Sequence, residues 1–124
     1  MKNSVAGVWS LPFKKDPGGY SVYIWDNEHN MCFNYLGNDY ALYERIVNLL
    51  NGEPAEPFKR VGFNENTIAV SDDEQATEAK PILLVRGWGH LTGRGGLRLS
   101  AEEAVNKQNE LLEYCAKKLK GLNV

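Results

Sequence analysis

The sequence predicts an α+β protein: an antiparallel or mixed sheet of five or six strands with two helices packed on one face. Two segments carry apolar residues at helical spacing, and several short runs of β-branched and aromatic residues are separated by turn residues. The connections between these elements are short, which favours this arrangement. With 124 residues, 43% of them hydrophobic, the chain has the size and composition of a single domain, 1–124.

The first quarter of the chain predicts three strands. Residues 5–9 are apolar and indicate an edge strand, and residues 12–19 contain enough prolines and glycines to predict a loop. Residues 20–25 and 31–36 are rich in β-branched and aromatic side chains. The Asp/Asn-rich residues 26–30 between them predict a hairpin turn.

The aromatic strand 20–25 has two alternative interpretations. Tyr23 and Trp25 lie on one face of the strand, and Val22 and Ile24 lie on the other. If the helices cover only one face, the aromatic side chains form an exposed patch, either a partner surface or a stacking surface for a ligand. Alternatively, the N-terminal segment covers that second face.

A first helix is predicted over residues 39–50. Asn38 is the expected N-cap, and Asn51 followed by Gly52 is a typical stop signal. The side chains expected in its buried stripe are Leu42, Ile46, Leu49 and Leu50.

The second half of the chain predicts three more strands. Residues 58–63 and 67–71 form a hairpin pattern, and the polar residues 72–80 indicate an exposed loop. Residues 82–85 are apolar at every position, which predicts a central strand covered on both faces.

The last helix has the clearest start signal. Ser100 and Glu103 have the spacing of a capping box, and Gly121 marks the predicted end. The expected buried stripe is Ala104, Leu111, Cys115 and Leu119, widened by Val105 and Leu112.

Charge and cysteine content limit the function classes. The net charge of −2 gives no overall reason to bind nucleic acid or an anionic membrane, so such binding would need a local patch. Cys32 and Cys115 have no metal-site or redox spacing and are expected to be free, buried thiols. The first residues lack the apolar run of a signal peptide, and residues 82–85 are too few to span a membrane. We therefore expect a cytoplasmic protein with no membrane partner.

One stretch, residues 86–98, suggests a binding site. No acidic residue occurs between Ala79 and Ala101, and closely spaced glycines could turn backbone amides toward an anion. If the strand continues past Val85, the alternation of side chains places Arg86, Trp88 and His90 on one face of the strand. The predicted ligand-binding residues are Arg86, Trp88, His90, Arg94 and Arg98.

The same stretch has a purely structural interpretation. The glycines then shape a turn, Trp88 fills the core, and the arginines are solvated or pair with acids of residues 72–78. The stretch does not match the phosphate-binding pattern that ends in Gly-Lys-Ser/Thr, nor the dinucleotide pattern G-x-G-x-x-G. His29 and His90 are the only imidazoles, and neither has a nucleophile or carboxylate placed beside it by spacing. No catalytic residue, metal site or cofactor is predicted.

Residues 86–96, with Leu99 and then Glu103, Ala104 and Gln108, resemble small uncharacterised proteins of phages and integrated mobile elements. The resemblance covers about the last third of the chain. It implies a cytoplasmic protein in a bacterial or phage setting, with no assigned activity and no functional residue to carry over.

Two functions are consistent with these observations. The first is a non-enzymatic binding module for a phosphate-bearing ligand, a nucleotide or a nucleic acid, that uses residues 86–98. The alternative is a homo-oligomeric interaction or accessory protein that uses exposed sheet aromatics, with the glycine-rich stretch purely structural. An enzyme is the least favoured class.

Overall fold

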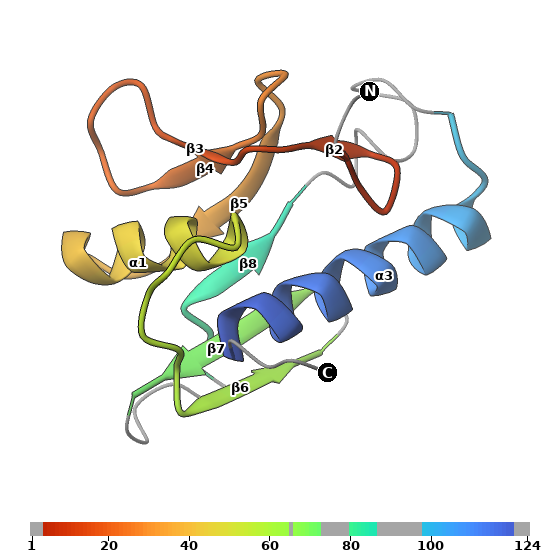
Figure 1. Ribbon diagram of the computed structural model, residues 1–124. Helices are drawn as coiled ribbons and strands as arrows, with labels where there is room; N and C mark the ends of the chain where they lie inside the picture. The colour runs from red at the N-terminus through yellow and green to blue at the C-terminus, as the bar shows by residue number, and fades with distance from the viewer. Residues whose placement is uncertain (1–3, 65, 73–79, 87–97, 121–124) are drawn as a thin grey trace.

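The computed structural model describes residues 4–64, 66–72, 80–86 and 98–120 (Figure 1). These residues form a six-stranded antiparallel sheet, a separate two-stranded sheet and two helices, so the protein has the predicted α+β fold. Figure 1 shows both helices on the same side of the large sheet. We refer to this side as the helix face and to the opposite side as the far face.

The strands of the large sheet follow the order β3-β4-β5-β8-β7-β6, and all neighbouring pairs are antiparallel. Both predicted hairpins, β4–β5 and β6–β7, are present. The apolar run near residue 83 forms β8, which lies between β5 and β7 as a central strand. The bounds are Lys14–Lys15 (β3), Tyr23–Trp25 (β4), Met31–Tyr35 (β5), Arg60–Phe63 (β6), Thr67–Ser71 (β7) and Leu83–Val85 (β8).

Helix α1 spans Tyr40–Leu50 and starts one residue later than predicted. Its N-cap is Asp39 and not Asn38, because the Asp39 carboxylate accepts a hydrogen bond from the Leu42 N–H at 3.2 Å. The helix ends at Asn51, and Gly52 follows with a φ of 78°, a left-handed conformation that glycine adopts without steric cost.

Helix α3 spans Ala101–Lys120 and has the predicted capping box. The Ser100 N–H donates to the Glu103 carboxylate at 3.0 Å, and the Glu103 N–H donates to the Ser100 hydroxyl at 3.2 Å. The backbone hydrogen bond from Ser100 lowers the pKa of the Glu103 carboxyl. The inclusion of Val105 in the buried stripe was wrong, since this side chain is 47% exposed. The buried face of the helix instead includes Gln108, whose side-chain amide donates to the Asn66 side chain at 2.9 Å.

Tertiary contacts changed the prediction for the N-terminal loop. Residues 12–19 include the edge strand β3, in which Lys14 pairs with Trp25 and Lys15 pairs with Ile24. The Asn51 amide holds the preceding residue, Phe13, by accepting from its N–H at 2.6 Å and donating to its carbonyl at 2.9 Å. A partner 38 residues away thus stabilises an extended conformation that the local sequence does not favour.

The predicted edge strand at residues 5–9 is also corrected. It is a small hairpin of β1 (Ser4–Val5) and β2 (Trp9–Ser10), because the chain turns back at Ala6 and Gly7, whose φ values are 52° and 74°. The fully buried Trp9 packs against Phe13 and Phe33, with ring centroids 6.0 and 5.1 Å apart.

Register shows on which side of the sheet this hairpin lies. Phe33 is opposite Ile24, which is opposite Lys15, and Lys15 forms an ion pair with Glu44 of α1 at 2.7 Å. These side chains therefore point to the helix face, and Trp9 packs on that same face. The N-terminal hairpin does not cover the aromatic side chains of the far face.

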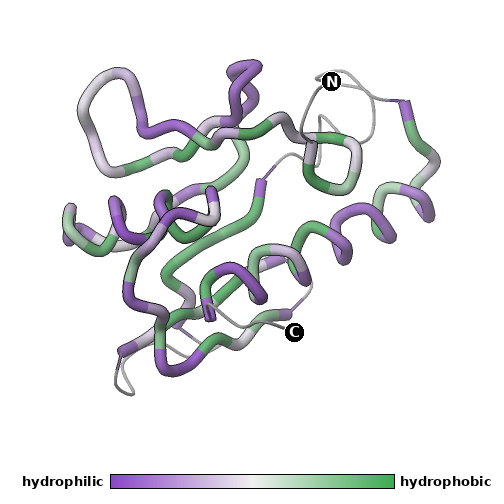
Figure 2. The backbone as a smooth tube through the Cα atoms, viewed as in Figure 1, coloured by the Kyte–Doolittle hydropathy of each residue, from purple (hydrophilic) through white to green (hydrophobic). Residues whose placement is uncertain are grey.

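The buried apolar side chains form one cluster between the sheet, the helices and the N-terminal hairpin. In Figure 2, β7 and β8 are hydrophobic along their length, whereas α3 alternates between hydrophobic and hydrophilic positions. Cys32 and Cys115 are both in this cluster as free thiols, as predicted. Neither described helix has the length and apolar character needed to cross a membrane.

Candidate functional site

The described structure includes the two ends of the predicted binding stretch. Arg86 directly follows β8, Arg98 precedes α3, and both side chains are exposed. The structure shows no contact between these two arginines. The other three predicted ligand-binding residues, Trp88, His90 and Arg94, lie outside the described residues. The described part of the candidate site therefore consists of Arg86 and the side chains near it on the neighbouring strands.

Strand register places Arg86 on the far face. Val85 is opposite the helix-face residue Phe33, so alternation directs the next side chain, Arg86, to the other side. The Arg86 N–H donates to the Cys32 carbonyl at 2.6 Å, which keeps this residue hydrogen-bonded to β5. Cys32, the residue of β5 opposite Arg86, is buried in the core, because the β4–β5 ladder is irregular here. The preceding residue, Met31, pairs with Trp25 directly, so Met31 is the residue of β5 that we place on the far face beside Arg86.

This level of the sheet continues to the edge strand β3. Lys14 on β3 pairs with Trp25 on β4, and its neighbour Lys15 points to the helix face, so Lys14 points to the far face. One row of side chains thus crosses four strands. We call it the far-face row: Lys14 (β3), Trp25 (β4), Met31 (β5) and Arg86 (following β8).

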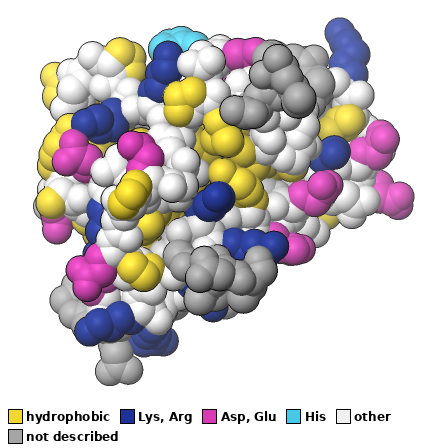
Figure 3. Space-filling model, in the orientation of Figure 1, with side chains coloured by type: hydrophobic (Ala, Val, Ile, Leu, Met, Phe, Trp, Pro, Cys, Tyr) yellow, Lys and Arg dark blue, Asp and Glu magenta, His cyan; other side chains and the backbone are white. Residues whose placement is uncertain are grey.

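The middle of the far-face row carries an aromatic stack. The imidazole of His29 lies parallel to the indole of Trp25, with 4.4 Å between ring centroids and 9° between planes. Tyr23 meets the edge of the same indole at 6.2 Å. His29 is exposed, and Figure 3 shows an imidazole at the molecular surface beside a cationic side chain. One face of the imidazole is covered by Trp25, so stacking of a further ring would occur on its other face.

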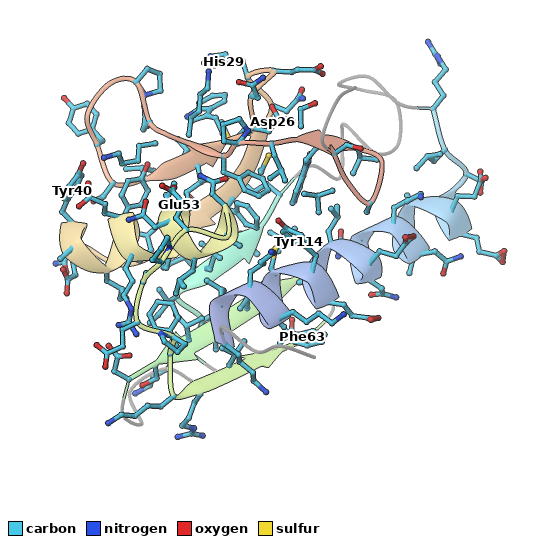
Figure 4. The ribbon with its side chains drawn as sticks, in the orientation of Figure 1. Asp26, His29, Tyr40, Glu53, Phe63 and Tyr114 are labelled. Atoms are coloured by element: carbon cyan, nitrogen blue, oxygen red, sulfur yellow. The ribbon has the colours of Figure 1, made fainter. Side chains whose placement is uncertain are left out.

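The β4–β5 turn holds His29 in this position. The buried Asp26 carboxylate accepts hydrogen bonds from the Glu28 and Asn30 N–H groups and from the Asn30 side chain, all between 2.8 and 3.0 Å. Within this turn His29 has a φ of 65°, which is uncommon for a residue other than glycine. Figure 4 shows Asp26 and His29 together in the turn, away from α3.

The far-face row carries a cation at each end. Lys14 and Arg86 are both exposed, and neither forms an ion pair with any residue in the described parts of the chain. Other cations differ: Lys15 is paired with Glu44, and Arg45 of α1 is paired with Asp72, each at 2.7 Å. Two cations that have no ion-pair partner among the described residues thus lie on either side of an aromatic stack.

Sequence reasoning missed the role of Arg45. Its guanidinium binds Asp72 and the carbonyl oxygens of Glu56 and Pro57, and it lies over the Phe58 ring at 4.0 Å. These partners are 11–27 residues away, so no local pattern reveals them. Asp72, one of the acids that the structural interpretation paired with the predicted arginines, is bound by Arg45 here. Residues 73–78 lie outside the described residues.

A cavity of about 360 Å³ lies next to Arg45, between α1 and the end of β7. Its two carboxylates already have protein partners, since Asp39 caps α1 and Asp72 pairs with Arg45. The cavity therefore lacks the free cation that a phosphate needs.

The two thiols and one phenol near the core have raised pKa values. The two thiols are buried, and burial raises the pKa of both Cys32 and Cys115, which disfavours the reactive thiolate. Burial also raises the pKa of Tyr114 to about 12, and its hydroxyl donates to the Leu50 carbonyl at 3.0 Å. In the part of the chain that the structure describes, no group of three or more His, Cys, Asp or Glu residues could hold a metal ion.

Comparison with known proteins adds no assignment to this geometry. No family model matches the chain, and neither a curated protein nor a solved structure matches it.

Proposed function

We propose that this protein is a non-enzymatic binding module for a phosphate-bearing ligand with an aromatic base, a nucleotide or a nucleic acid. The observation that carries the proposal is the far-face row, in which Lys14 and Arg86, neither paired with an acid among the described residues, lie on either side of the Trp25–His29 stack. Cations bind phosphate oxygens through charge-assisted hydrogen bonds, and aromatic rings on an open sheet face are a common way to stack bases.

The proposal joins the far-face row to the predicted stretch 86–98. Arg86 belongs to both, as the last described residue before Trp88, His90 and Arg94. In this proposal those residues, together with Arg98, bind the same ligand as the row. The net charge of −2 makes the local cations decisive, because the protein as a whole does not attract polyanions.

The alternative function is an interaction between copies of the chain or with another protein. It is favoured by exposed apolar side chains near the start of β4, the end of β5 and the start of α1. Because β4 and β5 are antiparallel neighbours and α1 follows β5 closely, these segments meet at one end of the sheet. The residues are Tyr20 (71% exposed), Val22 (39%), Leu36 (48%) and Tyr40 (48%).

Titration calorimetry with three probes at low salt tests the proposed function: AMP, ATP and a single-stranded twelve-nucleotide DNA. We expect at least one probe to bind, and Arg86→Ala to weaken that binding about tenfold or more, since a charge-assisted contact contributes about 1.5–3 kcal/mol. Lys59→Ala is the matched control, because it removes an exposed cation outside the row. Both variants should melt at the wild-type temperature.

Two results would contradict the proposed function. The first is that none of the three probes binds. The second is that Arg86→Ala lowers the melting temperature and leaves binding unchanged, which would make this arginine structural. A mass that rises with protein concentration, found together with no binding, would instead favour the alternative function.

A further inference from the structure

We infer that the ligand of the far-face row is a single-stranded nucleic acid that crosses the strands from β3 to β8, and not a free nucleotide. This inference rests on the proposed function. It follows from the order of chemical groups along the row: a cation, an aromatic stack, an apolar side chain and a second cation.

The separation of the two cations is the first argument. Lys14 is on the first strand of the order β3-β4-β5-β8, and Arg86 directly follows the fourth, so three interstrand spacings, or roughly 14 Å, separate their positions. A base stacked on His29 lies between them. The phosphate of a free mononucleotide extends from one side of its sugar, so it reaches one of the two cations. A nucleotide inside a nucleic-acid strand has a phosphate on each side of its sugar, so the strand can contact both cations.

The form of the aromatic stack is the second argument. His29 is exposed and backed by Trp25 at 4.4 Å, so it offers an open ring face and not a closed pocket. An enclosed pocket is typical of sites that bind a free small molecule. An open ring beside a track of positive charge is typical of surfaces that bind single strands with little sequence preference.

The surroundings of the row are the third argument. The next level of the far face contains Tyr23, Asn34 and Leu84, which pair across β4, β5 and β8 and are all half-buried. This level carries no charge and would repel no phosphate. Among the described acidic groups near the row, the Asp26 carboxylate is turned into the hairpin and Glu44 is on the helix face, whereas Glu28, next to His29, is exposed.

Fluorescence anisotropy can test the inference on the full chain with three labelled probes. They are a twelve-nucleotide oligothymidylate, thymidine monophosphate, and an abasic twelve-unit backbone that has the same phosphates and no bases. We expect the oligothymidylate to bind at least tenfold more tightly than the mononucleotide. Its affinity should fall with salt between about 50 mM and 200 mM, because the phosphates release counterions.

Four variants separate the contributions of the row. Lys14→Ala and Arg86→Ala should each weaken binding of the oligothymidylate about tenfold. Each should also reduce the magnitude of the slope of log affinity against log salt by about 0.7. His29→Asn removes the ring but keeps a residue that tolerates positive φ, so the turn is retained. This variant should bind the oligothymidylate about fivefold or more weakly, and its affinity for the abasic probe should not change. Lys59→Ala should change nothing.

The possible failures are distinguishable. If the mononucleotide binds as tightly as the oligothymidylate, and only one of Lys14→Ala and Arg86→Ala affects binding, the inference is overturned while the proposed function stands. If the abasic probe binds as well as the oligothymidylate, base stacking on His29 is excluded and the inference fails. If no probe binds, both the inference and the proposed function fail.

Discussion

At the scale of single residues, the Asp26 carboxylate accepts four hydrogen bonds beside the candidate site. Its buried carboxylate accepts hydrogen bonds from Glu28, Asn30 and the Ser10 N–H at 3.0 Å. The first two partners close the β4–β5 turn, and Ser10 belongs to the N-terminal hairpin. One side chain therefore both shapes the turn that carries His29 and attaches β2 to the sheet.

We expect Asp26→Ala to destabilise the protein by about 3 kcal/mol or more. The substitution leaves the buried Ser10 N–H and the part-buried Glu28 and Asn30 N–H groups without an acceptor, and each buried group left in this way costs about 1–3 kcal/mol. Denaturant unfolding followed by circular dichroism measures the effect. Asp16→Ala is the matched control, since its carboxylate accepts one described hydrogen bond, from Gly18 in an exposed turn, and should cost less than about 1 kcal/mol. Equal losses in the two variants would mean that Asp26 does not anchor the turn.

At the scale of elements, α3 joins the two halves of the fold. Its buried side chains contact β6 and β7 and also pack near α1, where the Tyr114 hydroxyl donates to the last helical residue, Leu50. The buried face of α3 is a continuous apolar stripe that contains one polar residue, Gln108. That exception is tolerated because Asn66 satisfies the Gln108 amide.

The buried face of α3 can be tested with two substitutions on the same helix. Leu111 is fully buried and Val105 is 47% exposed. We expect Leu111→Ala to cost about 2–5 kcal/mol through lost burial and a residual cavity, and Val105→Ala to stay within about 0.5 kcal/mol. Against a total stability of about 5–15 kcal/mol, the first loss is readily measured by thermal or denaturant unfolding. A Leu111→Ala variant as stable as Val105→Ala would show that the helix face is misassigned.

At the scale of the whole molecule, acidic groups in and beside the core link its stability to pH. Burial raises the pKa values of five of them above their ordinary values: Cys32, Tyr35, Tyr43, Tyr114 and Cys115. The folded protein therefore holds these protons at a pH where the unfolded chain has begun to release them. Stability should be independent of these groups below about pH 8.5 and should fall as the pH rises above it.

This linkage predicts that the melting temperature declines steadily from about pH 9 to pH 11. Tyr114→Phe keeps the ring and removes the ionisable hydroxyl, so the decline above about pH 10 should become shallower in this variant. Scanning calorimetry at a series of pH values measures both curves. A melting temperature that stays constant up to pH 11, or identical slopes in the two proteins, would contradict the linkage.

The sequence by itself determined most of the secondary structure. The capping box at Ser100 and the stop at Gly52 act through neighbouring residues, so their signals are local. The central position of the strand near Leu83 was also predictable, because only a strand with neighbours on both sides buries an unbroken apolar run. The thiols were correctly expected to be free and buried.

Only the tertiary structure decided the elements and contacts that depend on distant partners. Strand β3 forms because Asn51 holds Phe13, and Arg45 finds Asp72 across 27 residues. The far-face row has the same origin. Lys14, Trp25 and Arg86 come from separate strands, and the order of those strands brings them to one level of the sheet. A local sequence pattern can predict on which face of a strand a side chain lies. The side chains beside it on that face depend on strand order and register, and these are set by packing of the whole core.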